Sequence, residues 1–346
     1  MSTFSNKPVI SRKKMDLKDR VTIYEVAKVA GVSLATVSRV INNQGNVTEK
    51  TKQRVEETIE KLGFRPSSIA RSLATSKSTN IGIMLPASGY MYISNMLDGM
   101  IDTAKIYGYI TSLFVTKRTK EDAKNMIELL IRSHVDGAVI YDDELGTDEI
   151  MTIQNYHVPL VIIGHKMENE SLGSIEIQFK EPILDVVKEH LSNGNDDIKI
   201  LDILNQGRLI DEIRDAIVKY GTSINKNIEL IKFNDSYSLV YDGMKEYFKT
   251  HKSGFFICPR DSLAAAVINA ATEAGLNIPG DVQVLAEIGS KYSYIIRPEI
   301  SSFSIDMFKV GSMAMRMLTK LLNPSDVASE KSMKIKATYN KRQTTK

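Results

Sequence analysis

Two short segments with helical apolar periodicity meet at one glycine near the start of this chain. The run from Val21 to Asn42 has the sequence VTIYEVAKVAGVSLATVSRVIN, with Gly31 between the segments and Ser33 just before the second. Glycine gives the backbone freedom that a tight turn needs, and serine is a preferred N-cap residue. The pattern predicts a helix-turn-helix, whose second helix fits the major groove of B-form DNA. An ordinary three-helix bundle that binds no nucleic acid is the alternative.

The apolar positions of this unit predict a small shared core, and the remaining positions predict a DNA-binding face. The expected core residues are Val26, Ala27, Val29, Val32, Val37 and Val40. The expected outward face of the second helix consists of Leu34, Ala35, Thr36, Ser38, Arg39 and Asn42. Arg39 is the leading candidate because its guanidinium can pair bidentately with guanine or phosphate. A third helix is expected from Thr48 to Leu62, with Thr48 and Thr51 as phosphate donors at its N-terminus.

At these residues the chain resembles the LacI/GalR family of bacterial transcription regulators. The resemblance continues through Gly45-Asn46-Val47-Thr48, Arg65-Pro66 and Ala70-Arg71-Ser72-Leu73-Ala74. It implies a DNA-binding headpiece at 21–66, then a hinge helix and linker at 67–80. It adds six residues to the DNA-binding set, namely Thr22, Ser33, Asn46, Val47, Ala70 and Leu73. By the resemblance, Leu73 wedges into the minor groove at the centre of the operator.

Charge is divided unevenly along the chain. Residues 1–80 hold 15 Lys and Arg against 7 Asp and Glu, a net charge of +8, and the remainder has a net charge of −5. This division indicates a basic DNA-binding module on a mildly acidic body. Residues 1–20 are predicted to be a disordered basic tail without the apolar stretch of a secretory signal. The single cysteine, Cys258, and the lack of a membrane-length apolar run favour a cytoplasmic protein.

From residue 81 onward, short apolar runs alternate with amphipathic stretches. Strands are expected at 81–84, 110–114, 137–141, 160–163, 198–203, 228–231, 255–257 and 282–285, and helices at 93–107, 120–133, 182–192, 237–250 and 261–274. This α/β rhythm predicts doubly wound parallel sheets in two lobes. The resemblance extends here to a periplasmic-binding-protein-like core. It implies an N-subdomain at 81–180 plus 304–327 and a C-subdomain at 181–303 plus 328–346, with crossings near 176–182, 299–305 and 325–330.

A cleft between two such lobes usually binds a small effector. By the resemblance, its candidate residues are Asp261 and Arg260. His165 is a further candidate because it directly follows an expected strand, with an ordinary loop histidine as the alternative. Two departures alter the sugar-binding pattern, because Arg260 replaces the usual asparagine and Ile288 lies where a carboxylate is expected. Isoleucine accepts no hydrogen bond from a sugar hydroxyl. Asp261 also has a structural interpretation as the N-cap of its helix.

A second kind of control is implied by similarity to regulators of carbon catabolism within the family. The supporting strings are Arg297-Pro298, Gly311 to Lys320, and Ile106 to Tyr109. Those regulators are activated by the serine-phosphorylated phosphocarrier HPr, and the resemblance implies contacts from Arg316, Lys320 and Tyr107. Arg316 and Lys320 are four residues apart on one expected helix face, a cationic pair suited to phosphoserine. A solvated basic face is the alternative.

The sequence therefore predicts a homodimeric repressor of carbon-metabolism genes, with no cofactor and no metal. Two headpieces related by symmetry are needed to read a pseudo-palindromic operator. A repressor controlled by a small carbohydrate in a rearranged cleft is the alternative within this class. Outside it, a transport-type solute-binding protein would share the core, and an enzyme would need a catalytic constellation. The five histidines show no metal-binding spacing, so catalysis is not expected.

Overall fold

The computed structural model describes residues 21–42, 45, 47–65, 78–87, 91–117, 119–141, 147–164, 172–194, 197–204, 206–323 and 331–346. The chain divides into two compact units, one up to Ser78 and one from Thr79 to Lys346, which are described separately. The predicted tail at 1–20, the hinge-helix residues Ala70 and Leu73, Asn46 and His165 lie outside the described residues.

The first unit contains the predicted helix-turn-helix and a third helix. These are α1 (Ile23–Ala30), α2 (Leu34–Ile41) and α3 (Glu49–Leu62). Gly31 adopts the left-handed conformation, with φ of 63°, and its amide donates to the carbonyl of Ala27. Ser33 caps α2, because its Oγ accepts from the backbone amide of Thr36 at 3.2 Å. The turn and the cap that the sequence predicted are confirmed.

A compact apolar core holds the three helices together. Its buried members are Val26, Ala27, Ala30, Val37, Val40, Val55 and Phe64. Val32 is partly buried against this core, as predicted, but Val29 is 56% exposed and the prediction that it belongs to the core is wrong. The buried residues of α1 form a stripe through positions 26, 27 and 30. At about 100° per residue, position 29 lies off that stripe.

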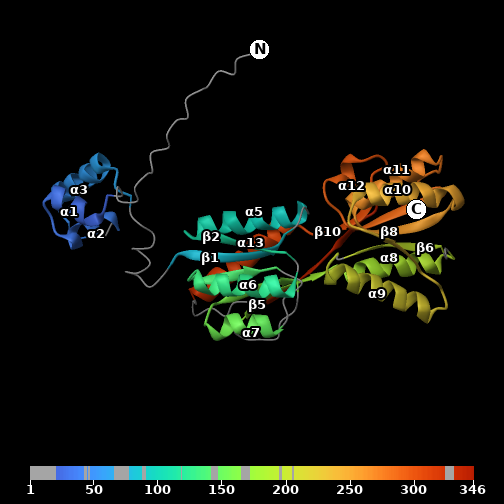
Figure 1. Ribbon diagram of the computed structural model, residues 1–346, viewed down its shortest axis with the longest axis horizontal. Coiled ribbons are helices and arrows are strands. Elements are labelled where there is room, and N and C mark those ends of the chain that lie inside the picture. Colours follow the sequence, from blue (N-terminus) through green and yellow to red (C-terminus); the bar gives the residue numbers. More distant parts are fainter. Residues whose placement is uncertain are drawn as a thin grey trace, which may run out of the picture. The chain divides into compact units, whose positions relative to one another are not determined.

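The second unit contains two six-stranded sheets, one in each lobe (Figure 1). The first sheet has the order β11 (Ser332–Lys336), β5 (Leu172–Gln178), β4 (Leu160–Gly164), β3 (Gly137–Ile140), β1 (Asn80–Pro86) and β2 (Ile110–Thr116), and its strands are all parallel. The second has the order β12 (Thr338–Asn340), β10 (Ser301–Ser304), β9 (Val282–Ile288), β8 (Gly254–Arg260), β6 (Ile198–Ile203) and β7 (Glu229–Phe233), with β12 alone antiparallel to its neighbour.

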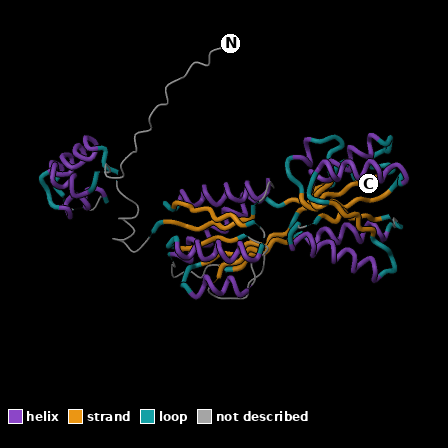
Figure 2. The backbone as a smooth tube through the Cα atoms, in the orientation of Figure 1, coloured by secondary structure: helices purple, strands orange, loops and turns teal. Residues whose placement is uncertain are grey.

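Helices cover both faces of each sheet (Figures 1 and 2). In the first lobe, α5 (Met91–Ile106) and α13 (Met307–Leu322) cover one face, and α6 (Lys120–Arg132) and α7 (Thr147–Asn155) cover the other. In the second lobe, α8 (Lys180–Ser192) and α9 (Arg208–Ser223) lie opposite α10 (Tyr237–Thr250) and α11 (Asp261–Glu273). The short α12 (Tyr292–Ile295) follows β9. The predicted fold class, with two doubly wound lobes, is confirmed.

The chain passes between the lobes in three places. The first passage lies between β5 and α8, and the second lies between β10 and α13. The third is at Ala337, because β11 pairs in parallel with β5 in the first sheet and β12 pairs with β10 in the second. The expectation that the last crossing falls near 325–330, with 328–346 in the C-subdomain, is therefore wrong for residues 332–336. The alternating SMKIK pattern of β11 suits an edge strand that buries only one face.

Helices α5 and α13 cross with their backbones in close approach at Gly99 and Gly311. A Cβ added at Gly99 would overlap the carbonyl of Phe308, and one added at Gly311 would overlap the carbonyl of Met96. Both glycines are buried. Only glycine permits this approach, because any side chain would meet backbone atoms that cannot rotate away.

Replacing Gly311 with alanine should therefore destabilise the core by at least roughly 1–3 kcal/mol, the usual cost of overpacking. Urea denaturation would show a lower midpoint with an unchanged slope. Lys309→Ala, an exposed change on the same helix, serves as the control. Equal midpoints for the two variants would contradict a close backbone contact at Gly311.

Candidate DNA-binding face and ligand cleft

The exposed side of α2 presents most of the predicted DNA-binding residues. Leu34, Ala35, Arg39 and Asn42 are exposed, and Thr36 and Ser38 are half-buried. Two local bonds order this side: Ser33 Oγ lies 2.8 Å from Thr36 Oγ1, and Asn42 Nδ2 donates to Ser38 Oγ at 3.4 Å. Ser33 thus serves as the helix cap, and none of the described residues pairs with the Arg39 guanidinium. Arg39 can therefore reach DNA without breaking an existing bond.

The ends of α1 and α3 hold the other predicted contacts of the headpiece. The Glu25 carboxylate accepts from the Thr22 amide at 2.6 Å and from its hydroxyl at 3.0 Å. These hydrogen bonds, with the backbone contact the larger cause, lower the pKa of Glu25. Thr48 Oγ1 lies 2.9 Å from Thr51 Oγ1 at the start of α3. Val47 is partly buried against the apolar core. Its side chain therefore contributes to packing in addition to any contact that it makes with DNA.

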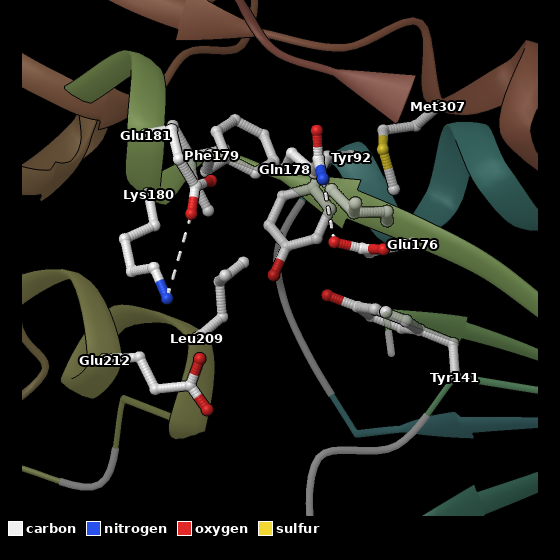
Figure 3. A pocket seen from close by; sticks show the side chains of 13 residues that line it. Tyr92, Tyr141, Glu176, Gln178, Phe179, Lys180, Glu181, Leu209, Glu212 and Met307 are labelled. Atoms are coloured by element: carbon white, nitrogen blue, oxygen red, sulfur yellow. Dashed lines mark hydrogen bonds and ion pairs between the residues drawn. The ribbon is translucent and has the colours of Figure 1, made fainter. Parts of the chain in front are cut away.

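A cavity of about 170 Å³ lies in the second unit, where the carboxyl ends of strands from both lobes meet (Figure 3). This is the usual location of ligand sites in open α/β sheets. From the first lobe it is lined by Tyr92, Tyr141, Gly164, Glu176, Ile177, Gln178, Phe179 and Met307. From the second lobe it is lined by Lys180, Glu181, Leu209, Glu212 and Ile288. None of these polar residues was a candidate from the sequence.

Only some of the residues considered for the cleft lie at the cavity. Ile288, which stands where the sugar-binding pattern has a carboxylate, lines the cavity, whereas Asp261 and Arg260 do not. Asp261 is buried, and its carboxylate accepts from Ser293 N at 3.1 Å and Ser293 Oγ at 2.9 Å, as well as from the Ser290 amide. Arg260 bonds Asp235 and Ser262. Both residues hold the end of the second sheet together beside the cleft.

The structural interpretation of Asp261 as a helix N-cap is also corrected. The N-cap position of α11 is occupied by Arg260, and Asp261 is the first residue of the helix. Its side chain turns toward the segment after β9, where two amides and a hydroxyl are available. That tertiary arrangement satisfies the buried carboxylate better than one bond to its own helix.

Next to this segment, the second lobe contains a buried carboxyl group. Glu287 is 0% exposed, and neither of its side-chain oxygens has a hydrogen-bond partner among the residues that the structure describes. Burial raises the pKa of Glu287 to about 8, partly offset by Arg214. Arg214 itself bonds Asp202 at 2.9 Å and Asp211 at 2.8 Å. Because Asp202 and Asp211 already engage Arg214, burial dominates and Glu287 is mainly protonated at neutral pH.

Helix α13 exposes the predicted basic pair on its outer face. Arg316 and Lys320 are both exposed, and Phe308 is 46% exposed near the start of the helix. Tyr107, just beyond the end of α5, is 50% exposed. The ends of the two helices are joined, because Asn323 Nδ2 donates to Tyr109 Oη at 3.2 Å. Of the three predicted partner-binding residues, Arg316 and Lys320 therefore lie on α13, and Tyr107 lies just beyond the end of α5, where the two helices are joined.

The described residues contain no group of three or more histidine, cysteine, aspartate or glutamate side chains arranged to hold a metal ion. Among them, no helix is both long and apolar enough to span a membrane. Cys258 is buried, and burial raises the pKa of its thiol.

Comparison with known families agrees with both units of the structure. Residues 22–67 match bacterial regulatory proteins of the lacI family, and residues 229–345 match a periplasmic binding protein-like domain. Residues 22–67 are therefore a DNA-binding domain of the lacI type, and most of the chain is similar to transcriptional regulators of that family. The lacI headpiece distinguishes it from a transport-type solute-binding protein, which would share only the core.

Individual relatives support the same assignment. The chain is 27% identical to catabolite control protein A of Priestia megaterium over 315 residues, covering 89% of this chain and 95% of that protein. It is 28% identical to catabolite control protein A of Staphylococcus xylosus over 313 residues, covering 89% and 94%. The solved lac repressor dimer bound to operator and the anti-inducer ONPF has a TM-score of 0.78 at 21% identity, covering 94% and 99%. The transcription regulator CcpA of Lactococcus lactis has a TM-score of 0.62 at 20% identity, covering 77% and 99%.

The buried Glu287 predicts a pH dependence of stability. Its pKa rises from 4.5 to about 8 on folding, so between these values the unfolded chain has lost a proton that the folded chain keeps. The contribution of Glu287 to stability is therefore retained below pH 4.5 and falls by about 1.4 kcal/mol per pH unit up to pH 8. Glu287→Gln, which cannot ionise, should lose less stability between pH 5 and 8 in urea denaturation. Parallel pH profiles for the wild type and the variant would contradict a protonated Glu287.

Proposed function

We propose that this chain acts as a homodimeric repressor of carbon-metabolism genes, with each headpiece reading one half of a pseudo-palindromic operator in the bacterial cytoplasm. The observation that carries this proposal is the exposed face of α2, on which Arg39 is exposed and Thr36 and Ser38 are half-buried. One such helix reads only a few base pairs, so useful specificity requires two headpieces related by symmetry. The solved lac repressor is described as a dimer on its operator.

Dimerisation is further supported by apolar surface on each lobe. The edge strand β2 exposes Ile110, Leu113 and Val115, and the neighbouring Ile106 is 78% exposed. In the second lobe, Tyr292, Tyr294 and Ile295 are all at least 40% exposed around α12. Apolar groups clustered on the surface of a soluble protein favour a protein–protein contact. An edge strand with apolar side chains also needs to be covered to avoid uncontrolled pairing.

The proposal includes control by a phosphoprotein of the serine-phosphorylated HPr type. Arg316 and Lys320 are exposed at i and i+4 of α13, so a single phosphoserine can contact both cations. Tyr107 adds a half-exposed hydroxyl from the joined end of α5. The similarity to catabolite control proteins over 89% of the chain supports this choice of partner.

Control by a small effector is a second candidate function, and the inter-lobe cavity favours it. The cavity combines aromatic rings with polar groups that converge from both lobes. A ligand that contacts both lobes stabilises the closed arrangement of the core relative to an open one. Closure would then bias the headpieces toward or away from operator binding.

Arg39→Ala should weaken operator binding by about 1–3 kcal/mol and relax specificity at one base position. The operator would be obtained by selection from a randomised duplex pool, and affinities would be measured by fluorescence anisotropy at fixed salt. Lys61→Ala, which removes one exposed charge from the last turn of α3, is the control for lost charge. A uniform loss over all operator variants would instead identify a phosphate contact. Selection without enrichment of inverted half-sites would contradict the proposed function.

Serine-phosphorylated HPr is expected to raise the operator affinity of the wild type. In the double variant Arg316→Ala/Lys320→Ala, this gain in affinity should be smaller by about tenfold or more. Its affinity for operator without that partner should be unchanged. Lys105→Ala, an exposed cation on α5, and unphosphorylated HPr are the controls. Absence of a gain in the wild type would refute phosphoprotein control while leaving operator binding intact.

A further inference from the structure

A second cavity lies where the chain crosses between the lobes, and it shares no described lining residue with the inter-lobe cavity. We call it the hinge cavity, because two of the crossings form it. Ser304, at the end of β10, leads into α13, and Lys336 and Thr338 lie on either side of the crossing at Ala337. Ser304 and Thr338 belong to the second sheet, whereas Lys336 belongs to the first. Both lobes therefore contribute to the lining of the hinge cavity.

Two lysine side chains supply positive charge to the hinge cavity. Lys309 lies in the first turn of α13, and Lys336 is the last residue of β11. Both are exposed, and neither ammonium group forms a hydrogen bond or an ion pair with any of the residues that the structure describes. A ligand can therefore contact both ammonium groups without breaking an existing pair.

Asp306 is the single carboxylate among the described residues that line the hinge cavity. Its Oδ1 accepts from the backbone amide of Lys309 at 3.0 Å, and Asp306 is thereby the N-cap of α13. A carboxylate in this position interacts with the partial positive charge of the helix N-terminus. The two ammonium groups therefore leave the described lining with an excess of positive charge.

The rest of the lining combines hydroxyl groups with apolar side chains. Ser304 Oγ accepts from Asn340 Nδ2 at 2.8 Å, so its own hydrogen remains available to an acceptor. Thr338 adds a second hydroxyl on an exposed residue. The apolar side chains of the lining are all partly buried against the core, and they are Ile305, Met313 and Ile335. Such a lining suits a ligand that has anionic oxygens and a short hydrocarbon part.

We propose that the hinge cavity binds a compact dianion whose negative charges are held by Lys309 and Lys336. Two unpaired cations against one capped carboxylate favour a ligand with more than one negative charge. The cavity volume of about 280 Å³ lies just below the usual range of about 300–1,000 Å³ for small-molecule sites, so the ligand is small. Dicarboxylates and phosphate monoesters share this chemistry. The inference goes beyond the proposed function and does not depend on the inter-lobe cavity.

A ligand in the hinge cavity would contact both lobes at once. Hinge segments absorb the change in backbone conformation when two lobes move relative to each other. A dianion that joins Lys309 and Lys336 of the first lobe to the hydroxyls of Ser304 and Thr338 of the second therefore favours one arrangement of the lobes. Occupation of the hinge cavity would in this way add a route of control over the core.

Titration calorimetry on the full-length protein would compare two dianions with their monoanionic methyl esters. Succinate is paired with monomethyl succinate, and methyl phosphate is paired with dimethyl phosphate, at fixed ionic strength because salt screens exposed charges. The measurements are made at about pH 7.5, where a phosphate monoester carries nearly two negative charges. At least one dianion should bind about tenfold or more tightly than its ester.

The two arms of the experiment distinguish the sources of the dianion. A preference for succinate over its ester would identify a dicarboxylate, and a preference for methyl phosphate would identify a phosphate monoester. Equal affinities within both pairs, or no binding of either dianion, would overturn the inference.

The double variant Lys309→Gln/Lys336→Gln should abolish the preference for the dianion, because it removes both proposed charge contacts. Both residues are exposed, so the variant should keep the urea midpoint and the operator affinity of the wild type. Lys334→Gln is the matched control on the same strand. Lys334 pairs with Glu176 at 3.5 Å and does not line the hinge cavity, so this variant should keep the full preference.

Two further variants test whether the dianion binds elsewhere on the molecule. Lys180 lines the inter-lobe cavity, and Arg316 and Lys320 form the proposed phosphoserine site. Lys180→Gln and the double variant Arg316→Ala/Lys320→Ala should both keep the preference for the dianion. Loss of the preference in any of the three control variants, or its retention when both lysines of the hinge cavity are replaced, would overturn the inference.

Discussion

The glycine crossing of α5 and α13 is the contact on which the arrangement of the core depends. Helix α13 follows the second lobe in the sequence, yet it packs in the first lobe because Gly99 and Gly311 allow the two backbones to meet. The two helices begin at the cavity, where Tyr92 and Met307 line it. They end together at the Asn323–Tyr109 hydrogen bond, near Tyr107 and Lys320. One rigid pair of helices therefore connects the cleft with the proposed partner surface.

This connection gives a physical basis for combining two kinds of control. Helices in backbone contact cannot slide independently, because packed cores change between discrete arrangements rather than deforming continuously. A ligand that shifts Tyr92 or Met307 would move both helices as a unit. A phosphoprotein bound at Arg316 and Lys320 would stabilise one position of the same unit. The two sites would then be coupled, and by linkage each ligand would alter the affinity for the other.

Local patterns were sufficient to predict much of the fold. The helix-turn-helix and eight strands were recognisable because apolar periodicity, a turn glycine and a cap residue lie close together in sequence. The strands β5, β10, β11 and β12 were missed because they are short or mix polar and apolar residues, as in SSFS and SMKIK. Their strand conformation comes from pairing with distant strands, for which the sequence gives no local signal. For the same reason, the last crossing between the lobes was predicted at the wrong residues.

The candidate cleft was less predictable for a related reason. Tyr92, Tyr141 and Glu176 come from three separate elements and converge only in the folded core. Asp261 could be assigned to the wrong partner, because an aspartate at a helix start suits a cap as well as a tertiary hydrogen bond. Resemblance to the family located the cleft, but it could not supply the chemistry of side chains that differ from the family pattern.

The protonation state of Glu287 determines whether the second lobe has an additional negative charge next to this cleft. Glu287 directly precedes Ile288, which lines the cavity, and a charged carboxylate there would add to the acidic groups already present. Its burial keeps it neutral up to about pH 8, so its charge is not part of the field at neutral pH. Arg214 is already engaged by Asp202 and Asp211 and contributes little net positive charge. At neutral pH, Glu287 therefore adds no negative charge next to the cavity, and it would add one only as the pH rises toward 8.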